Sequence, residues 1–65
     1  MNNRKRQLNE NKFKQWIELS SGGRSYWYEV EGKLGYKARY IKEVDKNEDT
    51  LRFYQEIYNK EGILV

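Results

Sequence analysis

Apolar and polar side chains alternate along most of the chain after residue 24, which is the period of a half-buried β-strand. Three segments dense in aromatic and β-branched residues predict strands over residues 25–31, 36–44 and 50–58. Glycine-rich or polar turn signals separate these segments at intervals of about ten residues, as in a meander or a small barrel. The apolar run Ile63-Leu64-Val65 predicts a further strand that docks in the sheet or on a partner.

The N-terminal part of the chain has two interpretations. Residues 1–11 are polar and predict either a basic, flexible arm or a frayed helix. Phe13, Trp16 and Ile17 are spaced as on a helix, whereas Phe13, Ile17 and Leu19 alternate as on a strand. We favour the strand, because a glycine-containing turn follows it and leads into the next strand.

The predicted fold class is mainly β. We expect an antiparallel meander of four to five strands, open or curled toward a barrel, behind a flexible or helical N-terminal segment. If residues 9–19 are helical, the class becomes α+β. The chain divides into a basic flexible arm over residues 1–11 and a single antiparallel β domain over residues 12–65. Because 65 residues bury little surface, the free energy of unfolding should be about 3–5 kcal/mol.

Alternation along the three clear strands sorts their side chains into two layers. The layer that we expect to form the core contains Tyr26, Tyr28, Val30, Tyr36, Ala38, Tyr40, Val44, Leu51, Phe53 and Ile57. The opposite layer contains Trp27, Glu29, Lys37, Arg39, Ile41, Arg52, Tyr54, Glu56 and Tyr58. In this arrangement Trp27 needs a cover, which Phe13, Trp16 or a partner would supply. A shift of one residue in register would exchange members between the layers.

The composition excludes several classes of protein. The chain has no cysteine and no histidine, which removes disulfides, thiolate or histidine metal sites and the usual general base near neutral pH. We interpret the paired carboxylates, such as Glu29 with Glu31 and Glu48 with Asp49, as surface charge, because so small a sheet has little room for a desolvated cleft. We therefore expect no enzymatic activity, no catalytic residue, no metal site and no cofactor.

The sequence also suggests where the protein resides. No apolar run approaches the roughly 20 residues that a membrane-spanning helix needs. The basic residues near the N-terminus are not followed by the apolar stretch of a secretory signal. We expect a cytoplasmic protein that does not engage a membrane.

Basic charge is concentrated near the N-terminus. Residues 1–14 contain five basic residues and one acidic residue, whereas residues 15–65 contain eight basic and nine acidic residues. Basic arms of this kind neutralise phosphates and raise the affinity for nucleic acid without reading its sequence. The phosphate-contacting residues would be Arg4, Lys5, Arg6, Lys12 and Lys14. The simpler interpretation is a solvated tail that aids solubility.

Aromatic and basic side chains share the layer opposite the expected core. The candidate binding residues in it are Trp27, Arg39, Arg52, Tyr54 and Tyr58. Single-stranded nucleic acid binders use such rings and guanidinium planes for base stacking, and protein interfaces are enriched in them. In the alternative, purely structural interpretation, the rings pack on the N-terminal segment and the arginines pair with Glu29, Glu43 or Glu56 across strands.

The succession of a basic N-terminal segment and a Tyr- and Arg-rich meander over residues 24–65 resembles the sheet of small ribosome-dependent mRNA-cleaving toxins. It also resembles SH3-like and chromo-type barrels. The likeness is one of layout without a diagnostic motif, so no residue role is transferred. A toxin–antitoxin-like component is a variant of the nucleic-acid hypothesis given below, and in that variant Arg39, Arg52 and a Tyr or Glu would act on an RNA phosphate.

These observations predict a small, non-enzymatic binding module. The first hypothesis is protein–protein interaction through the aromatic sheet face or an exposed edge strand, with a protein partner or a second copy of the chain. The alternative is binding of RNA or single-stranded DNA through the basic arm and the aromatic and arginine face.

Overall fold

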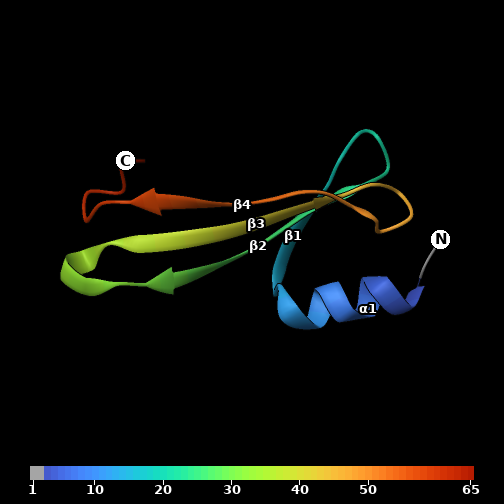
Figure 1. Cartoon of the computed structure of the whole chain (residues 1–65), viewed down its shortest axis with the longest axis horizontal. Coiled ribbons are helices and arrows are strands. Elements are labelled where there is room, and N and C mark those ends of the chain that lie inside the picture. The colour runs from blue at the N-terminus through green and yellow to red at the C-terminus, as the bar shows by residue number, and fades with distance from the viewer. Residues whose placement is uncertain (1–2) are drawn as a thin grey trace.

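The computed structural model describes residues 3–65 and shows an N-terminal helix followed by an antiparallel meander (Figure 1). The elements are α1 (Asn3–Lys12), β1 (Gln15–Glu18), β2 (Arg24–Glu31), the short 3₁₀ helix η1 (Lys33–Gly35), β3 (Lys37–Val44) and β4 (Thr50–Tyr58). The four strands form one sheet in the order β1-β2-β3-β4, and every neighbouring pair is antiparallel. The class is therefore α+β.

The predicted meander is confirmed, and the open alternative replaces the barrel, because β1 and β4 lie at opposite edges of the sheet. The three predicted strands agree with β2, β3 and β4 to within one residue. For the N-terminal segment the helix is the correct alternative up to Lys12, and the strand is correct for Gln15–Glu18. Residues 1 and 2 of the predicted arm lie outside the described part of the chain.

The core is small and aromatic. Phe13, Tyr26 and Val44 are fully buried, and Tyr28 packs against them. Phe13 follows the last turn of α1, and its N–H donates to the carbonyl of Asn9 at 2.7 Å, which continues the helical pattern by one residue. Its ring lies 5.9 Å from Tyr26 and 5.3 Å from Tyr28, so one side chain joins the helix to the sheet.

The register confirms the two predicted layers. Trp27 pairs with Ile41 and Ile41 with Tyr54, whereas Tyr26 pairs with Lys42 and Lys42 with Phe53. Side chains in the first row share one face, and those in the second share the face that Phe13 and α1 cover. Several members of the expected core layer remain exposed, namely Val30, Tyr36, Leu51 and Phe53. Leu51 lies at the irregularity where β4 shifts register against Glu43 and Val44.

The C-terminal run does not form a fifth strand. It makes a single bridge, between Leu64 and Tyr58, and the N–H of Val65 donates to the carbonyl of Ile57 at 2.9 Å. Ile63 to Val65 thus fold back on the end of β4, with all three side chains exposed.

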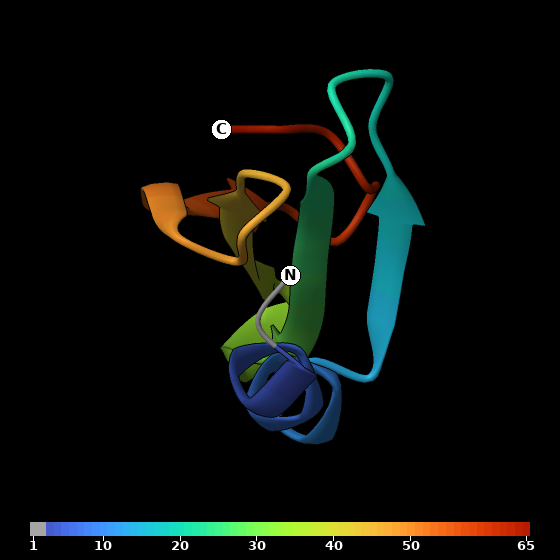
Figure 2. The same ribbon diagram turned by 90° about the vertical axis from the view of Figure 1, so that its right-hand side faces the viewer.

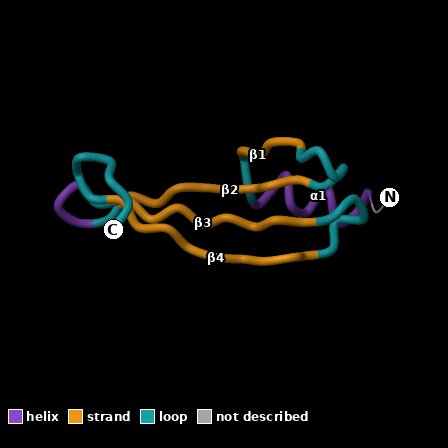
Figure 3. The backbone as a smooth tube through the Cα atoms, turned by 90° about the horizontal axis from the view of Figure 1, so that it is seen from above, coloured by secondary structure: helices purple, strands orange, loops and turns teal. Residues whose placement is uncertain are grey.

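The molecule is long and thin, 41 × 21 × 15 Å. Helix α1 and the short β1 lie together at one end, and β2, β3 and β4 continue beyond them as a ribbon (Figure 3). The accessible surface is 4895 Å². A compact monomer of this mass would expose about 4,450 Å². The excess follows from the uncovered ribbon.

Candidate functional site

The face of the sheet opposite α1 carries a groove. It has a volume of about 240 Å³ and is lined by Ile17, Ser25, Trp27, Arg39, Ile41, Tyr54 and Glu56. We call it the Trp27 groove. Ile41 forms its floor and is only 5% exposed, because Trp27 and Tyr54 flank it in the neighbouring strands. Trp27 itself is half-buried.

Neither of the rings that the sequence offered as covers lies over Trp27. Phe13 and Trp16 pack 5.9 and 5.8 Å from Tyr26, on the opposite face of the sheet. The tyrosine therefore faces the core, and the tryptophan faces the open side. An indole in this position resembles the aromatic anchors of protein interfaces.

The two predicted arginines of this face already have partners within the sheet. Arg39 donates from Nε and Nη2 to Glu29 Oε2, at 3.2 and 2.9 Å, and its guanidinium lies 5.2 Å from the Tyr58 ring. The hydrogen bond to Glu29 raises the pKa of Arg39. Arg52 stacks 4.0 Å from the Tyr54 ring.

Arg52 also contacts Glu43, with Nε 3.9 Å from Oε1. The predicted pairing of arginines with acidic residues across strands is thus confirmed for Arg39 with Glu29 and for Arg52 with Glu43. The guanidinium groups of Arg39 and Arg52 each stack on a tyrosine ring, so one face of each group is not available to a ligand.

The tyrosine hydroxyls of this face bond to acidic neighbours. Tyr58 donates to Glu56 at 2.8 Å, and this bond raises the pKa of the Tyr58 phenol. Burial, followed by the charge of Glu43, raises the pKa of Tyr54. Both phenols are therefore neutral hydrogen-bond donors at physiological pH.

All five predicted binding residues lie on the open face, and three of them line the groove: Trp27, Arg39 and Tyr54. Arg52 and Tyr58 flank it on β4. Ile17 and Ser25 line the groove but belong to neither predicted layer, because their place depends on the pairing of β1 with β2, where they lie opposite each other. A strand of four residues carries too little pattern to fix that register.

The predicted basic residues lie on the other side of the sheet, on or beside α1. Lys5 Nζ lies 2.6 Å from Asp49 Oδ1, and Arg6 Nη2 lies 3.9 Å from Glu48 Oε2. Lys12 Nζ lies 5.4 Å from the ring centre of Phe13. Arg4 is exposed in the first turn of α1, and Lys14 is exposed just after the helix. The structure thus separates the basic residues from the aromatic face instead of bringing the two together.

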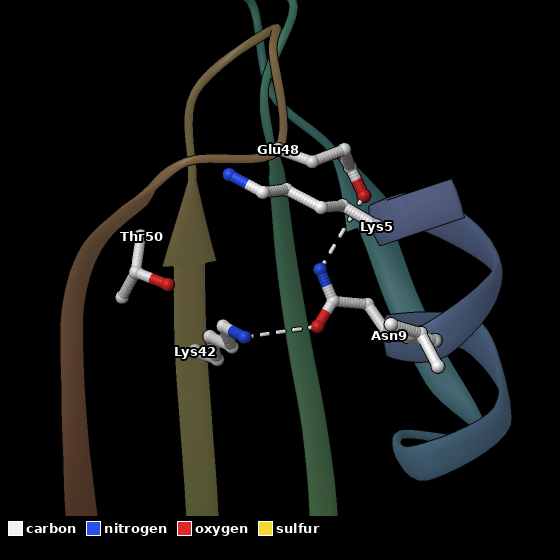
Figure 4. A pocket seen from close by; sticks show the side chains of 6 residues that line it. Lys5, Asn9, Lys42, Glu48 and Thr50 are labelled. Carbon is white, nitrogen blue, oxygen red and sulfur yellow. Dashed lines mark hydrogen bonds between the residues drawn. The ribbon is translucent and has the colours of Figure 1, made fainter. Parts of the chain in front are cut away.

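A buried polar network attaches α1 to the sheet, and sequence reasoning missed its three buried residues, Asn9, Arg24 and Glu48. Glu48 was interpreted as surface charge, which is wrong, because this residue is only 2% exposed. Its Oε1 accepts from the Tyr26 hydroxyl at 2.5 Å and from Asn9 Nδ2 at 3.5 Å. Asn9 Oδ1 in turn accepts from Lys42 Nζ at 3.0 Å, beside a pocket of about 180 Å³ (Figure 4).

Arg24 belongs to the same network and is 7% exposed. Its Nη1 donates to Glu10 Oε2 at 2.6 Å and to the Tyr26 hydroxyl at 3.2 Å, and its Nε donates to Glu18 Oε1 at 3.0 Å. One guanidinium therefore connects α1, β1 and β2. No local sequence pattern predicts this role, because the partners lie in three separate segments, α1, β1 and β2.

Within residues 3–65, no three acidic side chains converge on a point where they could hold a metal ion. In the same part of the chain, no helix has the length and apolarity that crossing a bilayer requires.

No protein-family model, no curated protein and no solved structure matches this chain.

Proposed function

We propose that this protein is a non-enzymatic interaction module that receives a protein partner on the open face of its sheet. The observation that carries the proposal is the Trp27 groove, which has an apolar floor at Ile41, an indole on one wall and Tyr54 on the other. Interfaces between proteins use aromatic anchors of this kind, surrounded by polar groups at the rim.

The charge of the open face favours a protein over a nucleic acid. This face carries four acidic residues, Glu29, Glu31, Glu43 and Glu56, and three basic ones, Lys37, Arg39 and Arg52. Binding of a phosphate backbone requires a positive surface, from which counterions are released. A nearly neutral face with internally paired arginines lacks that driving force. The basic residues of α1 cannot supply it, because they lie behind the sheet.

The test uses the two tryptophans as a matched pair. Trp27→Ala removes the wall of the groove, whereas Trp16→Ala removes an indole from the other face. Proteins captured from an extract of the source cells should be retained by the wild type and by Trp16→Ala, and lost with Trp27→Ala. The purified pair should then lose at least about 2 kcal/mol of binding free energy in calorimetry with Trp27→Ala.

Nucleic acid binding is the alternative outcome. Fluorescence anisotropy with a labelled single-stranded RNA at physiological salt should give a dissociation constant weaker than about 10⁻⁴ M. Tighter binding that falls steeply with salt and depends on Arg4 and Lys14 would contradict the proposal.

A further inference from the structure

The outer edge of β4 is open over most of its length. Within residues 3–65, the sheet ends at β4, and the C-terminal segment contacts this edge at Tyr58 and at the carbonyl of Ile57. The edge from Arg52 to Glu56 therefore presents unpaired backbone groups. Such an edge adds a strand from another chain unless a charge, a bulge or a cover prevents it.

The backbone direction along this edge follows from the bond to Ile57. Because the carbonyl of Ile57 accepts from Val65, residue 57 points its backbone groups outward. In an antiparallel ladder the direction alternates, so Gln55 and Phe53 also point outward, whereas Tyr54 and Glu56 bond to β3. An added strand would therefore bond to Phe53 and Gln55.

The side chains along the edge are self-complementary. On the open face, Arg52 and Glu56 lie two residues before and two residues after Tyr54. We propose that a second copy of this chain adds to β4 in antiparallel orientation, about a two-fold axis at Tyr54. This register sets Arg52 opposite Glu56 of the second copy, twice, and pairs Phe53 with Gln55 through four backbone hydrogen bonds.

Neighbouring registers do not match the charges. An axis at Gln55 sets Arg52 opposite Tyr58, and an axis at Phe53 sets Arg52 opposite Tyr54. The axis at Tyr54 is thus the one that pairs both Arg52 and Glu56 with a residue of opposite charge. Arg52 can make this contact while it stacks on Tyr54, because 60% of its side chain is exposed and its contact with Glu43 is long, at 3.9 Å.

Helix α1 leaves room for the second copy, and Val65, which lies opposite Ile57 where Leu51 of the second copy would follow, limits the new pairing to residues 52–56. Helix α1 lies beside β1 and β2, whereas β4 lies on the far side of the sheet (Figure 2). A two-fold axis perpendicular to the sheet keeps both helices on one face and both Trp27 grooves on the other. The result is a sheet of eight strands, with Tyr54 of each groove beside the axis.

This inference deepens the proposed function by naming a second copy as one partner, and it rests on the edge of β4. Tyr54 and Glu56 belong to both surfaces, whereas Arg52 and Gln55, the other two residues changed in the test below, lie outside the groove lining. The two can therefore fail separately. Loss of the dimer leaves the effect of Trp27→Ala on a protein partner intact, and loss of that effect leaves the dimer intact.

Charge exchange tests the proposal. In sedimentation equilibrium the wild type should dimerise, and Arg52→Glu and Glu56→Arg should each weaken the dimer by about 10- to 100-fold, because each sets like charges opposite each other twice. An equimolar mixture of the two single variants should form a heterodimer of wild-type affinity. The double variant, with both changes in one chain, should also dimerise. Lys46→Glu, a charge change in the exposed β3–β4 loop, should leave the dimer unchanged.

A second variant guards against loss of the fold. Gln55→Pro removes an outward N–H and leaves the ladder to β3 in place, so it should give a folded monomer by circular dichroism and sedimentation. A wild type that remains monomeric at millimolar concentration would overturn the proposal. Equally, single variants that dimerise like the wild type, or a mixture that forms no heterodimer, would contradict it.

Discussion

At the scale of single residues, Tyr26 is held both by ring contacts and by hydrogen bonds to its hydroxyl. It is fully buried, its ring packs between Phe13 and Trp16, and its hydroxyl donates to Glu48 while accepting from Arg24. Burial, followed by the hydrogen bond to Glu48, raises the pKa of this phenol to about 12. The folded state thus favours the neutral phenol of Tyr26 more strongly than the unfolded chain does.

The consequence is a loss of stability in alkali. Because the folded pKa lies above the unfolded value of 10.0, the stabilisation is complete below pH 10 and is lost as the pH rises toward 12. Urea unfolding should show a decrease of about 2–3 kcal/mol across this range. The hydrogen bond to Asp49 raises the pKa of Lys5, so the contribution of Lys5 to stability is also lost as the pH rises. Tyr26→Phe should be about 1–3 kcal/mol less stable at pH 8 and should show a flatter decrease. An unchanged slope would contradict this account.

A second prediction at this scale concerns Leu34. It has φ of 59° and is followed by Gly35 at φ of 80°, which is the pattern of a type I′ turn. Leucine is strained in this conformation, and its side chain is 85% exposed, so packing does not compensate. Leu34→Asn should raise the free energy of unfolding by about 0.5–1 kcal/mol, because asparagine tolerates positive φ. Urea unfolding measures this; a lower stability would be inconsistent with strain at Leu34.

At the scale of elements, the strands were predictable and the attachment of the helix was not. The alternation of β2, β3 and β4 is a local signal that fixes both their limits and their faces, so Trp27 was placed on the correct side. Helix α1 has no apolar stripe, since Leu8 is exposed and Asn9 is its buried residue. Its first turn contains Arg4, Lys5 and Arg6 and no acidic residue, and positive charges at this end interact unfavourably with the helix dipole. Its position depends on Glu48 and Arg24, which only the folded chain brings near.

Phe13 and Trp27 should therefore contribute differently to the free energy of unfolding. Phe13→Ala removes the ring that joins α1 to the sheet and should cost about 3–5 kcal/mol, close to the whole stability expected for a chain of this size. Trp27→Ala removes a half-buried ring from the open face and should cost about 1–2 kcal/mol. Thermal unfolding followed by circular dichroism compares the two variants. Similar losses in both would show that the open face belongs to the core.

At the scale of the whole molecule, the binding surface is open because α1 and β1 are shorter than β2, β3 and β4. Helix α1 has 10 residues and β1 has 4, whereas β2, β3 and β4 have 8 or 9 each. Helix α1 covers one end of one face, and β1 extends the sheet beside β2 at that same end (Figure 3). The opposite face remains open along its whole length, and β4 remains an edge, so the same difference in length exposes both the Trp27 groove and the edge at Tyr54.

The same uneven cover divides the molecule into two regions of different local stability. The backbone near Tyr26 and Val44 lies under Phe13, whereas Val30 has an exposed side chain and Ala38 is only partly buried. Amide hydrogen exchange should therefore be slow near Tyr26 and Val44, where exchange requires global unfolding. It should be faster near Val30 and Ala38, where local opening costs less free energy than global unfolding. Two-dimensional NMR in deuterated buffer would resolve this gradient along β2 and β3. The covered end is then the part that persists longest as the protein unfolds, and the uncovered ribbon is expected to open first.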